Sequence, residues 1–200
     1  MTEQNVEFGK PFETFGEWLE EAKASEINDP TGMALATTTP DGRPSLRMVL
    51  LKGWDERGFV FYTNLDSRKG GELKDNASVA LLFHWKSLRR QIRIEGQVSP
   101  VTSEEADEYF ASRPRASRIG AWASKQSSPM QGRFEFEAEI AKYTTKFGVG
   151  EIPRPENWSG FRVKPQAFEF WRDRKFRLHE RLQYDLVDGE NGWKITELYP

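Results

Sequence analysis

Two small groups of cations in this sequence could together bind a phosphate. Arg47 and Lys52 begin and end one apolar run, and Arg68 and Lys69 follow a second run closely. The residues between the runs, 55–58, form a good turn sequence, so we expect a β-hairpin. Cations at strand ends and on the following loop converge on one rim of a sheet, where they suit a phosphate. A hairpin with solvated ends would explain the same residues equally well. The two runs are residues 47–52 and 59–63.

The cation Lys69 lies near the start of an expected short helix, residues 68–76. A positive side chain there opposes the helix dipole, which favours negative charge at a helix N-terminus. A bound anion would resolve this conflict, because free N–H groups and nearby cations both attract phosphate.

A second polar group, Tyr109, Arg113 and Ser117, is spaced four residues apart. A capping box at residues 102–105 begins one helix, and Pro114 suits the first turn of the next. If the helix axis bends only mildly there, the three side chains share one stripe and could bind a phosphate. A merely polar helix face is the alternative, and spacing alone favours it about two to one.

A third group, Arg177 and His179, lies near the C-terminus. In an extended segment both side chains point the same way, while Leu178 points into the core. Such a pair could orient a polar ring. A strand edge with a satisfied histidine is the alternative.

The composition bounds the function. The chain has 200 residues, a formal net charge of −2, no cysteine and two histidines. Cysteine chemistry is excluded, a histidine-rich metal site is disfavoured, and so is a broad nucleic-acid-binding face. No apolar stretch is long enough to cross a membrane and no signal peptide is present, so we expect a single cytoplasmic domain.

Turn signals and periodicity predict a mainly β protein with added helices. Residues 1–11 are polar, and we expect them to be mobile. A capping box at residues 14–17 then begins a helix that ends before Asp29-Pro30. Six or seven strands, mostly linked by hairpins, suggest an antiparallel barrel with peripheral helices. The remaining expected strands are residues 33–39, 78–85, 89–98, 158–163, 167–171, 182–187 and 193–198, and the remaining helices are 103–112, one beginning near 114, and 134–147.

Several segments, in order, resemble the pyridoxine (pyridoxamine) 5′-phosphate oxidase family. The resemblance covers roughly residues 30–200. It is carried by Arg47-Met48-Val49-Leu50-Leu51-Lys52, Phe61-Tyr62-Thr63-Asn64, Ser67-Arg68-Lys69, Arg90-Gln91, Ser112-Arg113-Pro114-Arg115, residues 119–128, Glu169-Phe170-Trp171 and Arg177-Leu178-His179-Glu180-Arg181.

The resemblance implies a fold, a cofactor and a set of site residues. The family fold is an FMN-binding split β-barrel, and its members are homodimers with two FMN sites at the subunit interface. Arg68 and Lys69 would face the FMN phosphate. By resemblance, the FMN-binding residues are Arg47, Met48, Val49, Leu50, Leu51, Lys52, Tyr62, Thr63, Arg68, Lys69, Gln91, Gln126, Ser127, Trp171 and Arg181. The substrate-binding residues are Lys52, Tyr109, Arg113, Ser117, Arg177, Leu178 and His179, of which Arg177 and His179 would act in catalysis by holding the pyridine ring over the flavin.

The implied reaction is the oxidation of pyridoxine 5′-phosphate or pyridoxamine 5′-phosphate to pyridoxal 5′-phosphate, with dioxygen as acceptor and hydrogen peroxide as product. Another split-barrel flavin reductase and a non-enzymatic flavin-binding module are the alternatives. Many members of the family carry an Arg- and Tyr-containing segment before the first helix that can cover the active site. Residues 1–13 contain neither residue type, so they are not assigned this role.

Overall fold

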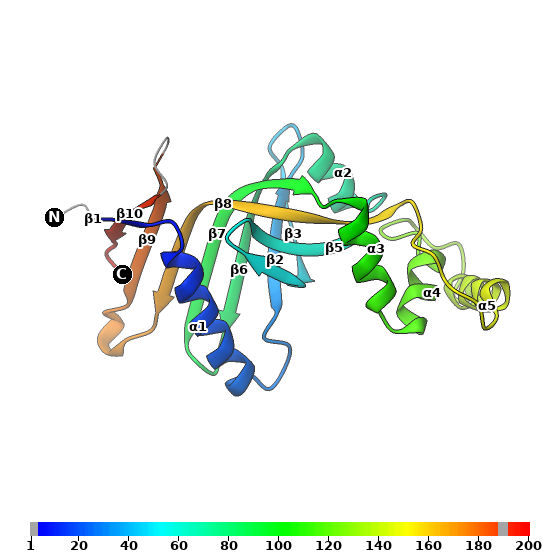
Figure 1. Ribbon diagram of the computed structural model, residues 1–200, viewed down its shortest axis with the longest axis horizontal. Helices are drawn as coiled ribbons and strands as arrows, with labels where there is room; N and C mark the ends of the chain where they lie inside the picture. Colours follow the sequence, from blue (N-terminus) through cyan, green and yellow to red (C-terminus); the bar gives the residue numbers. More distant parts are fainter. Residues whose placement is uncertain (1–3, 188–191) are drawn as a thin grey trace.

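The computed structural model describes residues 4–187 and 192–200. This part of the chain forms ten strands and five α-helices, which confirms the expected mainly β fold with added helices (Figure 1). In chain order the elements are β1 Gln4–Glu7, α1 Lys10–Ser25, β2 Gly32–Thr38, β3 Pro44–Leu50, β4 Gly53–Asp55, β5 Gly58–Asn64, α2 Arg68–Asp75, β6 Ser78–Trp85, β7 Arg90–Pro100, α3 Ser103–Ser112, α4 Arg115–Ala123, α5 Glu135–Phe147, β8 Trp158–Arg172, the 3-10 turn η1 Lys175–Arg177, β9 Glu180–Leu186 and β10 Gly192–Glu197.

Strand β8 is the axis of the sheet, because it has three antiparallel neighbours. Its first part, 158–163, pairs with β5, and its last part, 167–172, pairs with β9. Strand β7 runs along its other edge. The sheet therefore divides at the middle of β8, with β5 on one branch and β9, β10 and β1 on the other.

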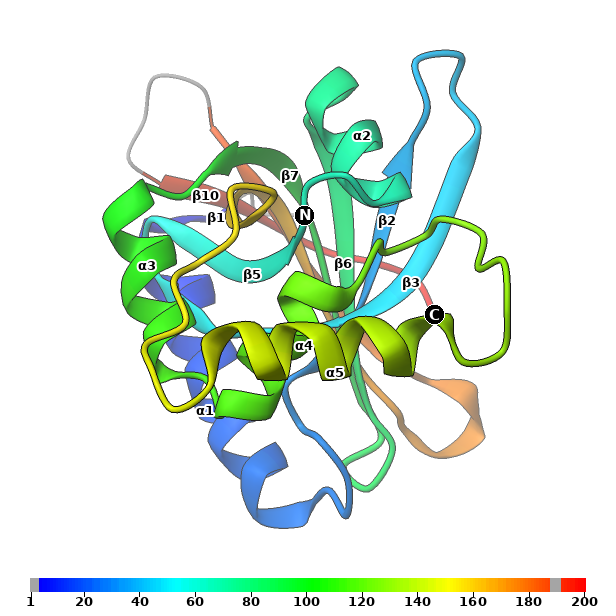
Figure 2. The same cartoon turned by 90° about the vertical axis from the view of Figure 1, so that its right-hand side faces the viewer.

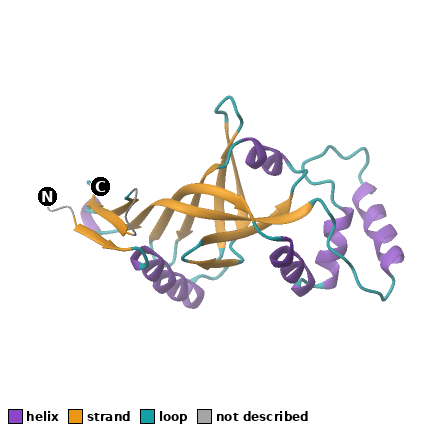
Figure 3. Cartoon of the chain, turned by 45° about the horizontal axis from the view of Figure 1, so that its top comes forward, coloured by secondary structure: helices purple, strands orange, loops and turns teal. Residues whose placement is uncertain are grey.

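The helices lie at different ends of the sheet. Helices α3, α4 and α5 gather at one end, whereas the chain termini lie with β1, β9 and β10 at the other (Figures 1 and 3). Viewed from the helical end, α5 crosses in front of α4, and α2 and β3 lie to one side of them (Figure 2). None of the described helices combines the length and apolarity needed to cross a bilayer.

Helix α1 closes the core of the sheet. Its face carries Phe12, Phe15 and Leu19, which are almost fully buried. Phe15 packs edge-on against Phe59 and Phe83 with ring centroids 4.8 and 5.2 Å apart. Aromatic pairs of this geometry add stability beyond their buried area. This packing holds α1 against the strands.

The N-terminal boundaries differ from the expectation. Helix α1 begins at Lys10 rather than at Thr14, because Pro11 suits its first turn. The Thr14 hydroxyl does not cap the helix but donates to the Lys10 carbonyl, 3.1 Å away. Gln4–Glu7, inside the segment expected to be mobile, forms β1 against β10, a strand that the sequence analysis missed. Residues 1–3 lie outside the described part.

The expected hairpin of residues 47–52 and 59–63 is wrong. Strand β3 pairs with β2, where Leu35 lies opposite Arg47. The partner of β5 across the turn is the three-residue strand β4. The turn was placed correctly, but the first run ends before it, so only the bond from Lys52 N to the Val60 carbonyl, 2.8 Å, joins that run to β5.

The two strands expected at 158–163 and 167–171 form one continuous strand of 15 residues, β8. Pro165 does not end it, because the register with β7 shifts between Glu95 and Gly96, opposite the proline. A Cβ on Gly96 would lie 2.2 Å from the Lys164 carbonyl oxygen, so this close approach needs glycine. The strands expected at 182–187 and 193–198 pair with each other as β9 and β10, and residues 188–191 between them lie outside the described part of the chain.

Candidate active site

A cavity of about 730 Å³ opens between β3, β5, the start of α2 and the helices α3 and α4. It brings together the two phosphate-binding groups expected from separate stretches of sequence. Of the predicted site residues, the cavity is lined by Arg47, Met48, Val49, Leu50, Lys52, Tyr62, Thr63, Lys69, Tyr109, Arg113, Ser117 and Gln126.

Tyr109, Arg113 and Ser117 face the cavity without sharing a helix. Helix α3 ends at Ser112, and Arg113 is extended, with φ −73° and ψ 147°. Helix α4 begins two residues later. The expected common stripe along a mildly bent axis is therefore wrong, and the extended residue itself brings the second helix to the cavity.

The guanidinium of Arg113 is incompletely neutralised. Its carbon atom lies 4.7 Å from the ring centre of Trp158, and its Nη1 atom is buried without a hydrogen-bond partner among the described residues. Burial lowers the pKa of Arg113, because it disfavours the charged form. A half-buried cation with a buried, unused donor is the arrangement that an anionic ligand would complete.

Lys69 is a second cation held at the cavity. Its Nζ atom lies 3.0 Å from Gln126 Oε1 and 3.5 Å from Ser67 Oγ. Burial and the charge of Arg47 both lower the pKa of Lys69. Ser67 caps α2 by accepting a hydrogen bond from Gly70 N, which fixes where the helix begins. The short helix expected at 68–76 is thus confirmed, with Lys69 in its first turn.

An aromatic wall lies beside these cations. Tyr62 stacks on Tyr109 at 4.1 Å and on Trp158 at 5.2 Å between ring centres. Burial raises the pKa of Tyr62, and the nearby charge of Glu105 raises it further, so the phenol stays neutral near pH 7. Flat apolar surface next to cations suits a planar ring that carries a phosphate.

The guanidinium of Arg47 is held in place by hydrogen bonds to four acceptors within the protein. Its Nη1 atom donates to the Leu35 carbonyl and to Thr37 Oγ1, and its Nη2 atom donates to Ser45 Oγ and to Glu72 Oε2. Arg47 therefore supplies positive charge at the cavity from a fixed position. Arg68 does not line the cavity, but its Nε atom donates to the other oxygen of Glu72.

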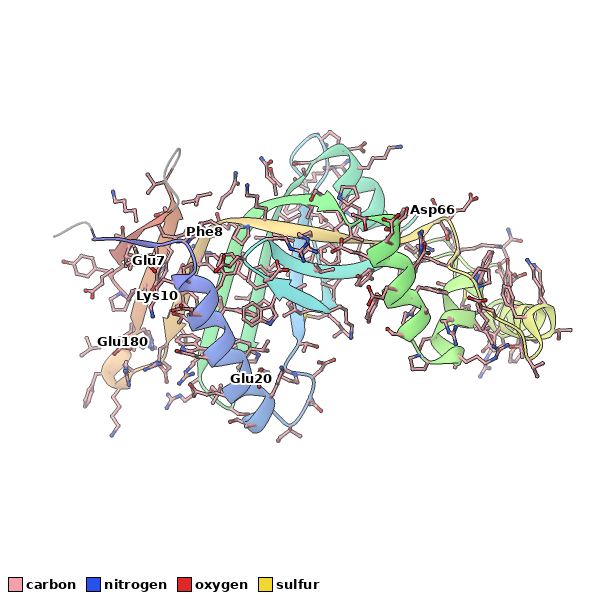
Figure 4. All side chains as sticks on the ribbon, viewed as in Figure 1. Glu7, Phe8, Lys10, Glu20, Asp66 and Glu180 are labelled. Atoms are coloured by element: carbon pink, nitrogen blue, oxygen red, sulfur yellow. The ribbon has the colours of Figure 1, made fainter. Side chains whose placement is uncertain are left out.

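A second set of predicted residues lies elsewhere in the chain. Gln91, Trp171 and Arg181 form one row across β7, β8 and β9. The Trp171 ring lies 4.8 Å from that of His179. Trp158 and Trp171 stand at opposite ends of β8, roughly 40 Å apart along the strand. In Figure 4, Asp66, which is close in sequence to Lys69 of the cavity, and Glu180, which is next to Arg181 of the second set, lie on opposite sides of the molecule.

The segment around Arg177 is not extended. Residues 175–177 form a 3-10 turn in which Phe176 and Arg177 have φ of 59° and 60°. Leu178 is 67% exposed. The expectation that Leu178 points into the core is therefore wrong, because the turn carries it outward. His179 Nδ1 lies 2.9 Å from Asp173 Oδ1.

Two further predicted residues do not line the cavity. Leu51 is packed in the main core. Ser127 has φ 71° and lines a smaller neighbouring hollow of about 290 Å³. Six lining residues were not predicted as site residues, namely Asn64, Gly120, Ala121, Ser124, Phe136 and Trp158. The first four lie inside segments that carry the family resemblance, whereas Phe136 and Trp158 do not.

Comparison with known families identifies the chain. Residues 19–147 match the family model described as pyridoxamine 5′-phosphate oxidase. The chain belongs to the pyridoxamine 5′-phosphate oxidase family. Residues 158–200 match a second model, the pyridoxine 5′-phosphate oxidase C-terminal dimerisation region. These matches confirm the family expected from the resemblance, and with it the expectation that the protein is an oxidoreductase.

Individual relatives agree with this assignment. Proteins named pyridoxine/pyridoxamine 5′-phosphate oxidase from Agrobacterium fabrum and Rhodospirillum rubrum are 56% and 60% identical to this chain, covering 100% and 98% of it and 95% and 99% of their own lengths. The crystal structure of PhzG from Burkholderia lata, with tetrahydrophenazine-1-carboxylic acid, is similar to this oxidase-family chain, with 34% identity, TM-score 0.89, and 95% and 92% of the two chains covered.

A more distant structure bears on the fold alone. An FMN-binding protein from Nostoc punctiforme, described as related to pyridoxamine 5′-phosphate oxidase, is 17% identical, with TM-score 0.75 and coverage of 94% and 96%. The split-barrel fold expected for the family is confirmed.

Proposed function

We propose that this chain, as an FMN-containing homodimer, oxidises pyridoxine 5′-phosphate or pyridoxamine 5′-phosphate to pyridoxal 5′-phosphate, with dioxygen as acceptor and hydrogen peroxide as product. One observation carries the proposal. A single cavity has one cation group at Arg47 and Lys69 and another at Lys52 and Arg113. Two such groups suit two phosphates, one on the cofactor and one on the substrate.

The residues present fit FMN. The cavity offers the charge of Arg47, the ammonium of Lys69 and the amide of Gln126 beside apolar side chains of β3. In the described part of the chain, Lys69 has only neutral hydrogen-bond partners, so a phosphate would supply the missing negative charge. Bound FMN would supply the hydride acceptor, and the protein need only bind and orient it.

The substrate phosphate would lie against Arg113, with Lys52, Tyr109 and Ser117 around it. The buried, unpaired Nη1 atom of Arg113 supports this placement. Because the phosphate does not react, its binding energy would position the far end of the substrate. Arg177 and His179 would hold the pyridine ring at that end.

Dimerisation would complete the site. Strand β3 is at the edge of the sheet, and its outward face exposes Leu46, Met48 and Leu50 to 69%, 67% and 40%. An exposed apolar edge next to the cavity suits a protein interface. The row of Gln91, Trp171 and Arg181 is remote from the cavity of its own chain, so we infer that it serves the cavity of a second copy.

The experiment is an aerobic turnover assay of the FMN-loaded protein. With pyridoxine 5′-phosphate or pyridoxamine 5′-phosphate, we expect pyridoxal 5′-phosphate and hydrogen peroxide in equal amounts. A protein that binds FMN and both phosphates but forms no product would be a binding module. Flavin reduction by a nicotinamide, and not by these substrates, would identify a reductase.

The similarity to PhzG supports a second candidate, oxidation of a carboxylated tricyclic compound. The cavity could also accept a carboxylate at Arg113. We favour the phosphorylated substrates, because relatives at 56–60% identity carry the oxidase name and the PhzG chain is 34% identical. The same assay with tetrahydrophenazine-1-carboxylic acid separates the two candidates.

A further inference from the structure

Glu72 is a buried carboxylate beside the expected flavin phosphate site. Its side chain is 5% exposed, and both of its oxygens accept hydrogen bonds. Oε1 accepts from Arg68 Nε at 2.8 Å, and Oε2 accepts from Arg47 Nη2 at 3.0 Å and from Thr37 Oγ1 at 2.5 Å. Burial alone would raise the pKa of Glu72, but these three hydrogen bonds together hold it below its ordinary value. The group is therefore a carboxylate at neutral pH.

Helix stability does not explain the Arg68–Glu72 pair. A pair four residues apart stabilises a helix more when the acidic residue comes first, in agreement with the helix dipole. Here the order is reversed, and Arg68 stands at the unfavourable N-terminal end of α2. The arrangement places a cation where a bound anion, not the helix, would benefit from it.

The two arginines depend on Glu72 to different degrees. Arg47 has three further acceptors in Leu35, Thr37 and Ser45, so it stays in place without the carboxylate. For Arg68, Glu72 is the one hydrogen-bonding partner in the described part of the chain, and the Arg68 side chain is 63% exposed. The Nε bond fixes the plane of the guanidinium and leaves both Nη atoms for a ligand.

We propose that Glu72 is a positioning residue that orients Arg68 toward the phosphate of the flavin nucleotide. The inference rests on the proposed function, because it requires FMN as the ligand, with its phosphate at Lys69, the cavity-lining residue that follows Arg68 in the first turn of α2. It assigns separate roles to the two arginines. Arg47 supplies positive charge from a fixed position. Arg68 supplies N–H groups in a set direction, and because the bond to Glu72 already orders its side chain, less conformational entropy is lost when the phosphate binds.

The same contact recurs at Arg181, another of the predicted flavin-binding arginines. Arg181 Nε donates to Glu169 Oε1 at 2.7 Å, and Glu169 is 7% exposed. In both places a buried glutamate holds an arginine by Nε. This second pair supports the interpretation that the Nε contact presents a guanidinium, since the two pairs lie in unrelated elements of the fold.

The test compares the binding of FMN and riboflavin, which differ by the phosphate, to the apoprotein by quenching of flavin fluorescence. We expect Glu72→Gln to weaken FMN on the order of tenfold and to leave riboflavin unchanged. Glu20→Gln is the control, because Glu20 is 69% exposed on α1 and pairs only with Lys23 (Figure 4). It should bind both ligands as the wild type does.

Tighter FMN binding by Glu72→Gln would overturn the proposal. If Glu72 acted only as a negative charge near the phosphate, its neutralisation would tighten FMN binding. Equal weakening of FMN and riboflavin would mean a purely structural role and would also contradict the proposal. Wild-type protein that binds no FMN would instead remove the proposed function, so the two failures are distinguishable.

A second pair of variants covers the case in which Glu72→Gln does not fold. Arg68→Lys keeps the charge but has no Nε–H fork for Glu72. We expect Arg68→Lys to lose nearly as much FMN affinity as Arg68→Ala. Wild-type affinity in Arg68→Lys would contradict the proposal.

Discussion

Lys69 and Gln126, which lie 57 residues apart in the chain, are joined by a hydrogen bond of 3.0 Å from Nζ to Oε1. The bond connects the first turn of α2 with the loop after α4. It places the ammonium group at the cavity, where burial and Arg47 lower its pKa.

This environment predicts a pH dependence of FMN affinity. Lys69 attracts a phosphate only when protonated, and its lowered pKa means that the apoprotein loses this proton below the ordinary lysine value of 10.5. Affinity should therefore be constant near neutral pH and fall as the pH rises toward that value. Tyr62 does not interfere, because burial raises its pKa. Lys69→Arg should abolish the fall. Identical alkaline profiles for the two proteins would exclude Lys69 as the titrating group.

Adjacent glycines of α2 should respond oppositely to alanine. A Cβ on Gly70 would lie 2.1 Å from the Leu65 carbonyl oxygen, whereas nothing lies within 4 Å of one on Gly71. Gly70→Ala should cost about 1–3 kcal/mol in the free energy of unfolding and weaken FMN, because the clash displaces the turn that carries Lys69. Gly71→Ala should gain about 0.5–1 kcal/mol from helix propensity. Urea unfolding measures both, and similar effects in the two variants would refute this prediction.

Arg113→Ala should weaken the binding of phosphorylated substrates and products but leave the binding of FMN unchanged. Loss of a charge-assisted pair with phosphate costs about 1.5–3 kcal/mol, which is tenfold or more in the dissociation constant. The measurement is competitive inhibition by pyridoxal 5′-phosphate, with unphosphorylated pyridoxal as the matched ligand whose binding should not change. If FMN is lost and inhibition is unaltered, Arg113 serves the cofactor phosphate.

His179→Ala should retain the flavin spectrum and slow flavin reduction, because we propose that His179 positions the pyridine ring rather than the cofactor.

Mixed dimers test whether each site is built from residues of both chains. His179→Ala and Arg113→Ala should each be impaired at both sites of their own homodimer, but mixed dimers of the two should regain one intact site each. Activity that does not return in verified mixed dimers would mean that each chain forms its own site.

Local patterns predicted much of the fold, and long-range pairing did not follow from them. Strand β6 was predicted from its continuous apolar run, β7 from its alternation and α3 from its capping box, because each signal depends on neighbours in sequence. The pairing of β3 with β2 and the passage of β8 through Pro165 depend on register between distant segments. Sequence patterns do not encode that register directly.

The site shows the same division. The resemblance identified twelve cavity residues, and the structure brings them to one place. The turn at Phe176 was not predictable, because a left-handed conformation at a residue other than glycine is imposed by its surroundings. Glu72 was also missed, because an acidic residue in a short helix gives no sign of burial until the tertiary contacts are known.

Anaerobic reduction of the bound flavin tests the central claim most directly. The FMN-loaded protein is mixed, without oxygen, with pyridoxamine 5′-phosphate or pyridoxine 5′-phosphate, and the visible flavin absorbance is followed. We predict that the absorbance bleaches as pyridoxal 5′-phosphate forms, and that it returns when oxygen is admitted. An unchanged oxidised flavin spectrum with saturating amounts of both substrates would contradict the proposed function.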